Sequence, residues 1–262
     1  MNLNLTGKTA VVCGSTQGLG YASAVELALL GTNVVLMSRN EEKLKEAVAS
    51  LDISKGQTHQ YLVADFSYSN HVITAINQFL ETGNTANILV NNTGGPTAGT
   101  VMNATVEEML QAFNNHLLCN HILTKAVVPG MKAAGYGRII NIISTSVKEP
   151  IAGLGVSNTI RAAVANWSKT LATELGPFGI TVNNVLPGFT QTARADYVIA
   201  SRIKQSGQSK EQVLATIEAE IPVGRIGRPE EFGAAVAFLA SPAAAYINGI
   251  NLPVDGGRLT CL

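Results

Sequence analysis

The feature that most constrains the fold of this 262-residue chain is a regular alternation of short apolar segments with longer helix-like segments. The apolar segments, such as Asn33–Ser38, have continuous apolar interiors rather than an apolar–polar alternation. Continuous apolar strands separated by helices of ten or more residues indicate a parallel sheet covered on both faces. No linker, repeat or low-complexity segment interrupts the pattern. We therefore expect one doubly wound α/β domain over residues 1–262, with a parallel sheet of about seven strands.

The pattern also places most of the individual elements. The expected strands are residues 9–13, 33–38, 60–64, 88–90, 138–143 and 180–185. The expected helices are residues 21–30, 41–51, 70–80, 106–132 and 161–175. In open parallel sheets, ligands bind outside the carboxyl ends of the strands, so the loops that follow these strands are where a site is expected.

A polar segment, residues 190–221, breaks the alternation after the last of these strands. Such an insert, at the carboxyl end of a strand, is well placed to be a mobile lid over a ligand crevice. We expect it to be a substrate lid. An ordinary pair of surface helices is the alternative.

The segment Thr9–Gly20 combines a strand, a glycine-rich turn and the start of a helix. Its glycines Gly14, Gly18 and Gly20 allow a sharp turn and a close approach of the backbone to a ligand. The helix that follows directs free N–H groups and its positive dipole end at the same place, which suits a pyrophosphate. Glycine clusters also form purely structural turns, so this segment alone leaves both interpretations open.

Composition excludes several functional classes. The formal net charge is zero, which removes the electrostatic footprint of a nucleic-acid-binding protein. No apolar run is long enough to span a bilayer, and the first residues do not resemble a signal peptide, so we expect no membrane association. The three cysteines are scattered and the four histidines do not cluster. We therefore expect a cytoplasmic protein with reduced thiols and no metal site.

Further motifs follow the glycine turn in a fixed order. They are Asp65, Asn91–Gly94, Pro187–Gly188 with Thr190 and Thr192, Gly227–Glu231 and Val254–Gly257. In this order and spacing the chain resembles the classical short-chain dehydrogenase/reductase family over essentially its full length, most of all 3-oxoacyl-[acyl-carrier-protein] reductases. The resemblance implies a single NAD(P)-binding Rossmann domain, a small-molecule carbonyl or alcohol substrate, and assembly as a homotetramer or dimer.

The resemblance also implies a set of cofactor-binding residues. Asp65 would meet the adenine ring, and the segment from Pro187 to Thr192 would hold the nicotinamide amide. The full expected set is Gly14, Ser15, Gly18, Leu19, Gly20, Ser38, Arg39, Asp65, Phe66, Asn92, Gly94, Arg161, Pro187, Gly188, Thr190 and Thr192.

The end of the second expected strand predicts which cofactor binds. NAD-binding proteins usually place a carboxylate there to accept from the ribose 2′-hydroxyl. Here Ser38 is followed by Arg39, and a neutral residue beside a guanidinium suits a 2′-phosphate. We therefore expect NADP(H). Arg39 as a solvated residue at a helix start is the alternative, and Gln17, where the family often has a second basic residue, weakens the argument.

The catalytic positions implied by the resemblance depart from the family pattern. Ser144, directly after the fifth strand, matches the family serine that polarises a carbonyl. Ser157 stands where the family has the proton-donating tyrosine, and Arg161 stands where it has lysine. None of the six tyrosines has a lysine four residues later. An aliphatic hydroxyl is a much weaker acid than a phenol, and an arginine stays protonated and shuttles protons poorly.

His116 aligns with an asparagine of the family on the long expected helix. Histidine titrates near neutrality and could replace the missing acid. A helix histidine that is satisfied by a neighbour is the alternative. Asn114 and Asn115 are adjacent, so a small register slip could also restore an asparagine. The candidate catalytic residues are therefore Ser144, Ser157, Arg161 and His116.

Two functions follow from these residues. The first is an NADP(H)-dependent oxidoreductase acting on a carbonyl or alcohol, 3-oxoacyl compounds being the nearest analogy, with His116 or a water held by Ser144 and Ser157 as the proton source. The second is an NADP-binding protein with little or no dehydrogenase activity, serving as a sensor, a partner subunit or a ligand binder. The apolar run Ala234–Ala240 and the low charge content are consistent with a buried subunit interface.

Overall fold

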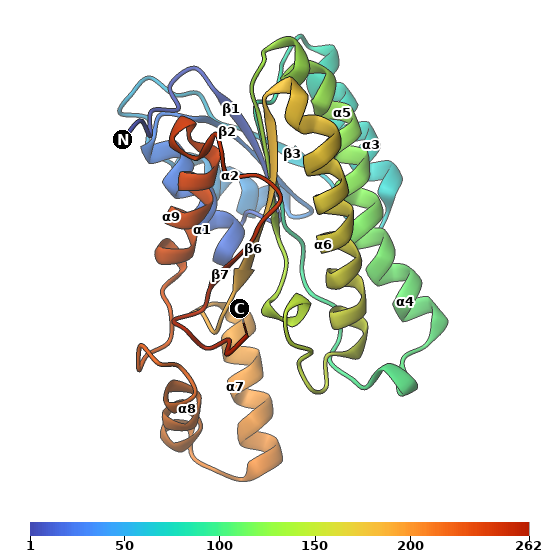
Figure 1. Cartoon of the computed structure of the whole chain (residues 1–262), viewed down its shortest axis with the longest axis vertical. Coiled ribbons are helices and arrows are strands. Elements are labelled where there is room, and N and C mark those ends of the chain that lie inside the picture. Colours follow the sequence, from blue (N-terminus) through green and yellow to red (C-terminus); the bar gives the residue numbers. More distant parts are fainter. Residues whose placement is uncertain (262) are drawn as a thin grey trace.

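The computed structural model describes residues 1–261; Leu262, which the domain prediction includes, lies outside the described residues. One parallel sheet of seven strands runs through the molecule in the order β3-β2-β1-β4-β5-β6-β7 (Figure 1). The strands are β1 Thr9–Cys13, β2 Asn33–Ser38, β3 Gln60–Val63, β4 Ile88–Asn91, β5 Gly137–Ile142, β6 Ile180–Pro187 and β7 Asn251–Val254. The predicted doubly wound Rossmann fold is confirmed, and the order reverses between β1 and β4, where such folds bind ligands.

Helices cover both faces of the sheet, and two apolar cores lie between them and the strands (Figure 1). Successive side chains of a strand point to opposite faces of the sheet. Val12 and Leu36 face one set of helices, while Val11 and Met37 face the other set. The first set is α1 Gly18–Leu29, α2 Glu41–Ala49 and α9 Pro229–Ala240. The second set is α3 Ser69–Glu81, α5 Cys119–Ala133 and α6 Gly155–Leu175. Burial on both faces explains why the strands are continuously apolar.

The long helix expected over residues 106–132 is interrupted. It consists of α4 Val106–Phe113, a π-helical turn at Asn114–Leu118, and α5. A π turn inserts one extra residue and so rotates the side chains that follow it around the helix axis. The π turn contains Asn114, Asn115 and His116, the three residues that the sequence leaves as alternatives for the position of the family's asparagine.

The segment predicted as a lid is a pair of helices, α7 Ala193–Ser206 and α8 Lys210–Ala219. The pair extends beyond the carboxyl ends of the strands (Figure 1). Ile199, Val213 and Ile217 of the pair form a small apolar cluster with Ile221 and Ile226, which follow α8. An ion pair between Arg258 and Glu220, 2.9 Å apart, ties α8 to the C-terminal segment. The start of the segment is also joined to the chain beyond it, since the backbone N–H of Gln191 donates to the carbonyl of Gly227 at 2.9 Å.

The apolar run Ala234–Ala240, expected at a subunit interface, is largely used within the chain. Val236, Ala237 and Leu239 are buried in the core of the first helix set. α9 also packs very closely on α1, since a Cβ at Gly233 would lie 2.6 Å from the carbonyl oxygen of Ala22. This run therefore needs no second subunit to be covered. Within residues 1–261, no helix has the length and apolarity that a membrane span requires.

Candidate functional site

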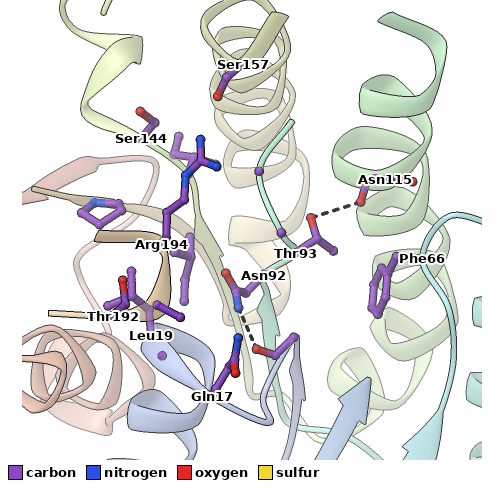
Figure 2. A pocket seen from close by; sticks show the side chains of 18 of the residues that line it. Gln17, Leu19, Phe66, Asn92, Thr93, Asn115, Ser144, Ser157, Thr192 and Arg194 are labelled. Carbon is purple, nitrogen blue, oxygen red and sulfur yellow. Dashed lines mark hydrogen bonds between the residues drawn. The ribbon is translucent and has the colours of Figure 1, made fainter. Parts of the chain in front are cut away.

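A cavity of about 700 Å³ lies at the carboxyl ends of the central strands and is bounded on one side by α7 (Figure 2). That size is ordinary for a cofactor or ligand site. The cavity brings together most of the residues that the sequence singled out. They are Gly14, Gly18, Leu19, Ser38, Arg39, Asp65, Phe66, Asn92, Gly94, Ser144, Ser157, Arg161, Pro187, Gly188, Thr190 and Thr192.

The glycine turn after β1 has the geometry of a phosphate cradle. Gly14 and Gly18 have φ of +56° and +59°, which favours glycine. A Cβ at Gly14 would lie 2.7 Å from the carbonyl oxygen of Asn92, whose amide in turn donates to the Gly14 carbonyl at 3.1 Å. The first turn of α1 has no side-chain cap and no acidic residue. Its N–H groups are therefore available to an anion in the cavity.

Ser15 and Gly20, both expected at the cofactor, do not line the cavity. The hydroxyl of Ser15 is buried and accepts from the backbone N–H of Met37 at 3.2 Å. Gly20 lies under the turn, where a Cβ would collide with the carbonyl of Gly14. Both residues thus support the turn from outside the cavity, and their contact with a cofactor stays a prediction.

One end of the cavity is formed by residues that follow β2 and β3. Ser38 and Arg39 both line it, as does Asp65. The carboxylate of Asp65 accepts from the backbone N–H of Ser67 at 2.9 Å, which fixes its orientation. Arg39 is exposed, and no carboxylate pairs with it among residues 1–261. An unpaired guanidinium at this place fits a phosphate.

The opposite end carries Ser144, after β5, and Ser157 and Arg161 on α6. Ser157 and Arg161 are one helical turn apart and face the same cavity. Arg161 is buried, and its Nη1 donates to the carbonyl of Ile142 at 3.0 Å, while its Nε has no partner in the described part of the chain. Burial lowers the pKa of Arg161 to about 10. An arginine with an orphaned donor beside a cavity fits an oxygen-rich ligand such as a ribose.

His116 does not line the cavity; Asn115 does. His116 is buried at 2% exposure, and its Nδ1 lies 2.6 Å from the hydroxyl of Thr93, which does line the cavity. Burial, reinforced by the positive charge of Arg161, holds the pKa of His116 well below its ordinary value. The histidine therefore remains neutral near pH 7, which does not suit the direct proton donor considered from the sequence.

Several residues of the cavity were not found from the sequence. They include Thr16, Gly95, Leu154, Phe189, Arg194 and Val198. Gln17, Thr93 and Asn115 also line the cavity; the sequence drew attention to their positions but did not place them among the expected site residues. Figure 2 shows the hydroxyl of Thr93 directed at Asn115, and the side chain of Arg194 entering the cavity from the start of α7. Thr93 lies within the motif Asn91–Gly94, whose position at the end of a strand points to the cavity. Nothing in the sequence around Arg194 distinguishes it from a solvated arginine.

Comparison with known proteins extends this description. A family model described as enoyl-(acyl carrier protein) reductase matches residues 14–258. The chain belongs to the short-chain dehydrogenase/reductase family. Among curated relatives, it is 32% identical to the NADPH-dependent reductase BacG of Bacillus subtilis, with 97% of this chain and 99% of BacG covered. It is 35% identical to the 3-oxoacyl-[acyl-carrier-protein] reductase FabG of Vibrio cholerae, with 97% and 98% covered.

Solved structures of family members share the whole fold. L-sorbose reductase of Gluconobacter frateurii, in complex with NADPH and L-sorbose, superposes with a TM-score of 0.94 at 32% identity, and each chain is covered completely. YwfH, an NADPH-dependent reductase involved in bacilysin biosynthesis, gives 0.91 at 30% identity, with 97% of this chain and 99% of YwfH covered. The family expected from the motifs is thereby confirmed.

Proposed function

We propose that this protein is an NADP(H)-dependent oxidoreductase acting on a carbonyl or alcohol substrate. The observation that carries the proposal is a single cavity in which the glycine turn of β1–α1 faces Ser144, Ser157 and Arg161. The cofactor is NADP(H), consistent with relatives and structural neighbours that are NADPH-dependent or bind NADPH or NADP. By analogy with the FabG relatives, 3-oxoacyl compounds are substrate candidates.

Different residues of the cavity bind different parts of the cofactor. In this proposal the pyrophosphate lies on the turn Gly14–Gly20 and the N-terminus of α1, and Arg39 pairs with the 2′-phosphate. Asp65 and Phe66 face the adenine, Arg161 donates to ribose hydroxyls, and Pro187–Thr192 faces the nicotinamide amide. The absence of a carboxylate at Ser38 supports the choice, since a carboxylate there would repel a 2′-phosphate.

When bound, NADPH supplies a hydride to the carbonyl carbon. Ser144 donates a hydrogen bond to the carbonyl oxygen, and the guanidinium of Arg161 stabilises negative charge that develops there. The proton comes from a water held between the hydroxyls of Ser144 and Ser157, because His116 is outside the cavity and stays neutral. The hydroxide that remains takes a proton from the solvent. Thr93 and His116 position the π-helical turn that brings Asn115 to the same cavity.

One observation favours the second function, an NADP-binding protein with little dehydrogenase activity. The residues that line the cavity within the described chain include no tyrosine and no lysine. The phenol that donates the proton in the family is therefore missing from the site, while the groups proposed to hold the cofactor are present. A sensor, a partner subunit or a ligand binder would retain this combination.

We further propose that α7 and α8 act as a substrate lid and that the chain assembles in the cytoplasm as a homotetramer or dimer. Residues of α7 line the cavity, and the pair shares a small apolar cluster with the residues that follow α8, so the two helices can move together. For assembly, the support is an exposed apolar stripe on α4, Val106, Leu110 and Phe113, spaced to share one helix face.

The proposed function is tested by NADPH oxidation against ketones, 3-oxoacyl thioesters and quinones, with NADPH binding measured in parallel by fluorescence. We expect turnover on at least one class and a loss of about 100-fold in kcat/KM for Ser144→Ala. Tight NADPH binding without turnover on any substrate would favour the second function. Absence of NADPH binding would overturn both.

A further inference from the structure

Arg194 occupies a distinctive place in the cavity. It is the second residue of α7, two residues after the N-cap Thr192, whose side chain accepts from the backbone N–H of Ala195. Its side chain enters the cavity, and Figure 2 shows the guanidinium directed toward the part of the cavity near Ser144, away from the glycine turn around Gln17. An arginine therefore reaches the reaction end of the site from the proposed lid.

The guanidinium of Arg194 has no anionic partner in residues 1–261. Within the described part of the chain no ion pair or hydrogen bond holds it, and its Cζ lies 5.4 Å from the centroid of the Tyr197 ring. Asp65 is the acidic residue among those that line the cavity, and it follows β3 at the adenine end. The reaction end thus holds two arginines, Arg161 and Arg194, and no carboxylate to neutralise them.

We propose that Arg194 binds an anionic group of the substrate, so that the substrate is a small carbonyl compound carrying a carboxylate or a phosphate. This inference rests on the proposed function. The guanidinium fork matches either group with two parallel hydrogen bonds. With the anion on Arg194 and the carbonyl oxygen on Ser144, two fixed points orient the reacting carbon. Because Arg194 lies on α7, an anionic substrate also draws the α7–α8 pair over the cavity.

The cofactor does not account for Arg194 equally well. Its pyrophosphate has the glycine turn and α1, and its 2′-phosphate has Arg39, at the far end from Ser144. A second guanidinium aimed at the carbonyl-polarising serine has no phosphate of the cofactor to pair with. Because Arg194 lies apart from the proposed phosphate sites of the cofactor, its effect on substrate binding can be measured separately from cofactor binding.

The test uses matched pairs of probes. They are acetoacetate and its methyl ester, 2-oxobutyrate and its methyl ester, and dihydroxyacetone phosphate and dihydroxyacetone. Steady-state rates with NADPH and calorimetric binding to the protein–NADP⁺ complex are measured for wild type, Arg194→Gln and Lys204→Gln. Lys204 is an exposed cation on the same helix outside the cavity.

We expect wild type to prefer the anionic member of at least one pair by about tenfold or more, and Arg194→Gln to weaken that member by about 10- to 100-fold. The change should appear mainly in KM for the anion, while the neutral member, the KM for NADPH and the Lys204→Gln variant stay within about twofold. The carboxylate and phosphate pairs identify which anion is recognised.

The outcomes separate this inference from the proposed function. Binding of the anion that depends on Arg194 but gives no turnover supports the inference while the oxidoreductase function fails. Turnover or binding without preference for any anionic probe overturns the inference and leaves the oxidoreductase intact. A raised KM for NADPH in Arg194→Gln, with anionic probes unaffected, also overturns it, because Arg194 would then serve the cofactor.

Discussion

The hydroxyl of Thr93 lies 2.6 Å from Nδ1 of His116, and this contact joins the loop after β4 to the π-helical turn between α4 and α5. It links a residue that faces the cavity to one that is buried behind it. Because burial and Arg161 lower the pKa of His116, the imidazole is a neutral partner in this contact. Its charge state is therefore coupled to folding rather than to the proton transfer of a reaction.

This coupling predicts a pH dependence of stability. The unfolded chain binds a proton at His116 below pH about 6.5, but the folded chain does not until far lower pH. The free energy of unfolding should therefore fall as pH falls below about 6.5, by at most about 1.4 kcal/mol per pH unit from this residue. His116→Gln keeps a hydrogen-bonding side chain but removes the titration, so its urea midpoint should fall less between pH 7 and pH 5. His121→Gln, an exposed histidine, is the control; equal slopes in all three proteins would contradict the argument.

The glycine turn gives a steric prediction. Alanine normally improves a helix by about 1 kcal/mol over glycine, yet a Cβ at Gly20 would collide with the Gly14 carbonyl. Gly20→Ala should therefore displace the turn and raise the Kd for NADPH by about tenfold or more. Gly95→Ala is the matched control, because Gly95 also lines the cavity but has open space around its Cβ position. Equal Kd values by fluorescence titration would show that the turn does not hold the phosphates.

Arg39 should determine the preference for NADPH over NADH. Removing one charge-assisted hydrogen-bonding partner costs about 1.5–3 kcal/mol, so Arg39→Ala should weaken NADPH by about 10- to 100-fold and leave NADH nearly unchanged. Lys43→Ala removes a nearby exposed cation outside the cavity and should alter neither value. Calorimetry with both cofactors provides the measurement, and a parallel loss for NADH would exclude a role at the 2′-phosphate.

The double variant Ser157→Tyr with Arg161→Lys tests what the altered catalytic pair means. It restores a phenol and an ammonium one helical turn apart at the cavity. If the native site has lost turnover, kcat for ketone reduction should rise from background by about tenfold or more. If the native site is catalytic by its own arrangement, the variant should be slower on the native substrate. Circular dichroism shows whether the double variant folds like the wild type.

The stripe on α4 predicts how assembly depends on one residue. Leu110 is 63% exposed and lies between Val106 and Phe113 on the same face. Leu110→Glu places a charge in the centre of the proposed interface and should shift sedimentation at micromolar concentration toward smaller species. Glu107→Gln, on the same helix, serves as control. A wild type that is already monomeric would remove the basis for the proposed oligomer.

The sequence alone determined the architecture and the cavity residues that directly follow a strand. Continuous apolar strands must be buried on both faces, which leaves the parallel sheet as the stable solution. Because the strands of such a sheet run in the same direction, the loops that follow them lie at one edge. The glycines of the turn, Asp65 and Ser144 could be placed for that reason, since each directly follows a strand. The sequence reveals these positions because each depends only on the strand that directly precedes it.

Tertiary structure decided the rest. The π-helical turn adds one residue to the helix and so turns Asn115, rather than His116, to the cavity, a rotation that no apolar periodicity records. The pKa of His116 depends on burial and on Arg161, which lies 45 residues away in the chain. In the sequence, nothing distinguishes Arg194 from a solvated arginine. Its proposed role in binding the substrate follows from the position of α7 beside the cavity. These properties arise from where distant segments meet, so only the folded chain reveals them.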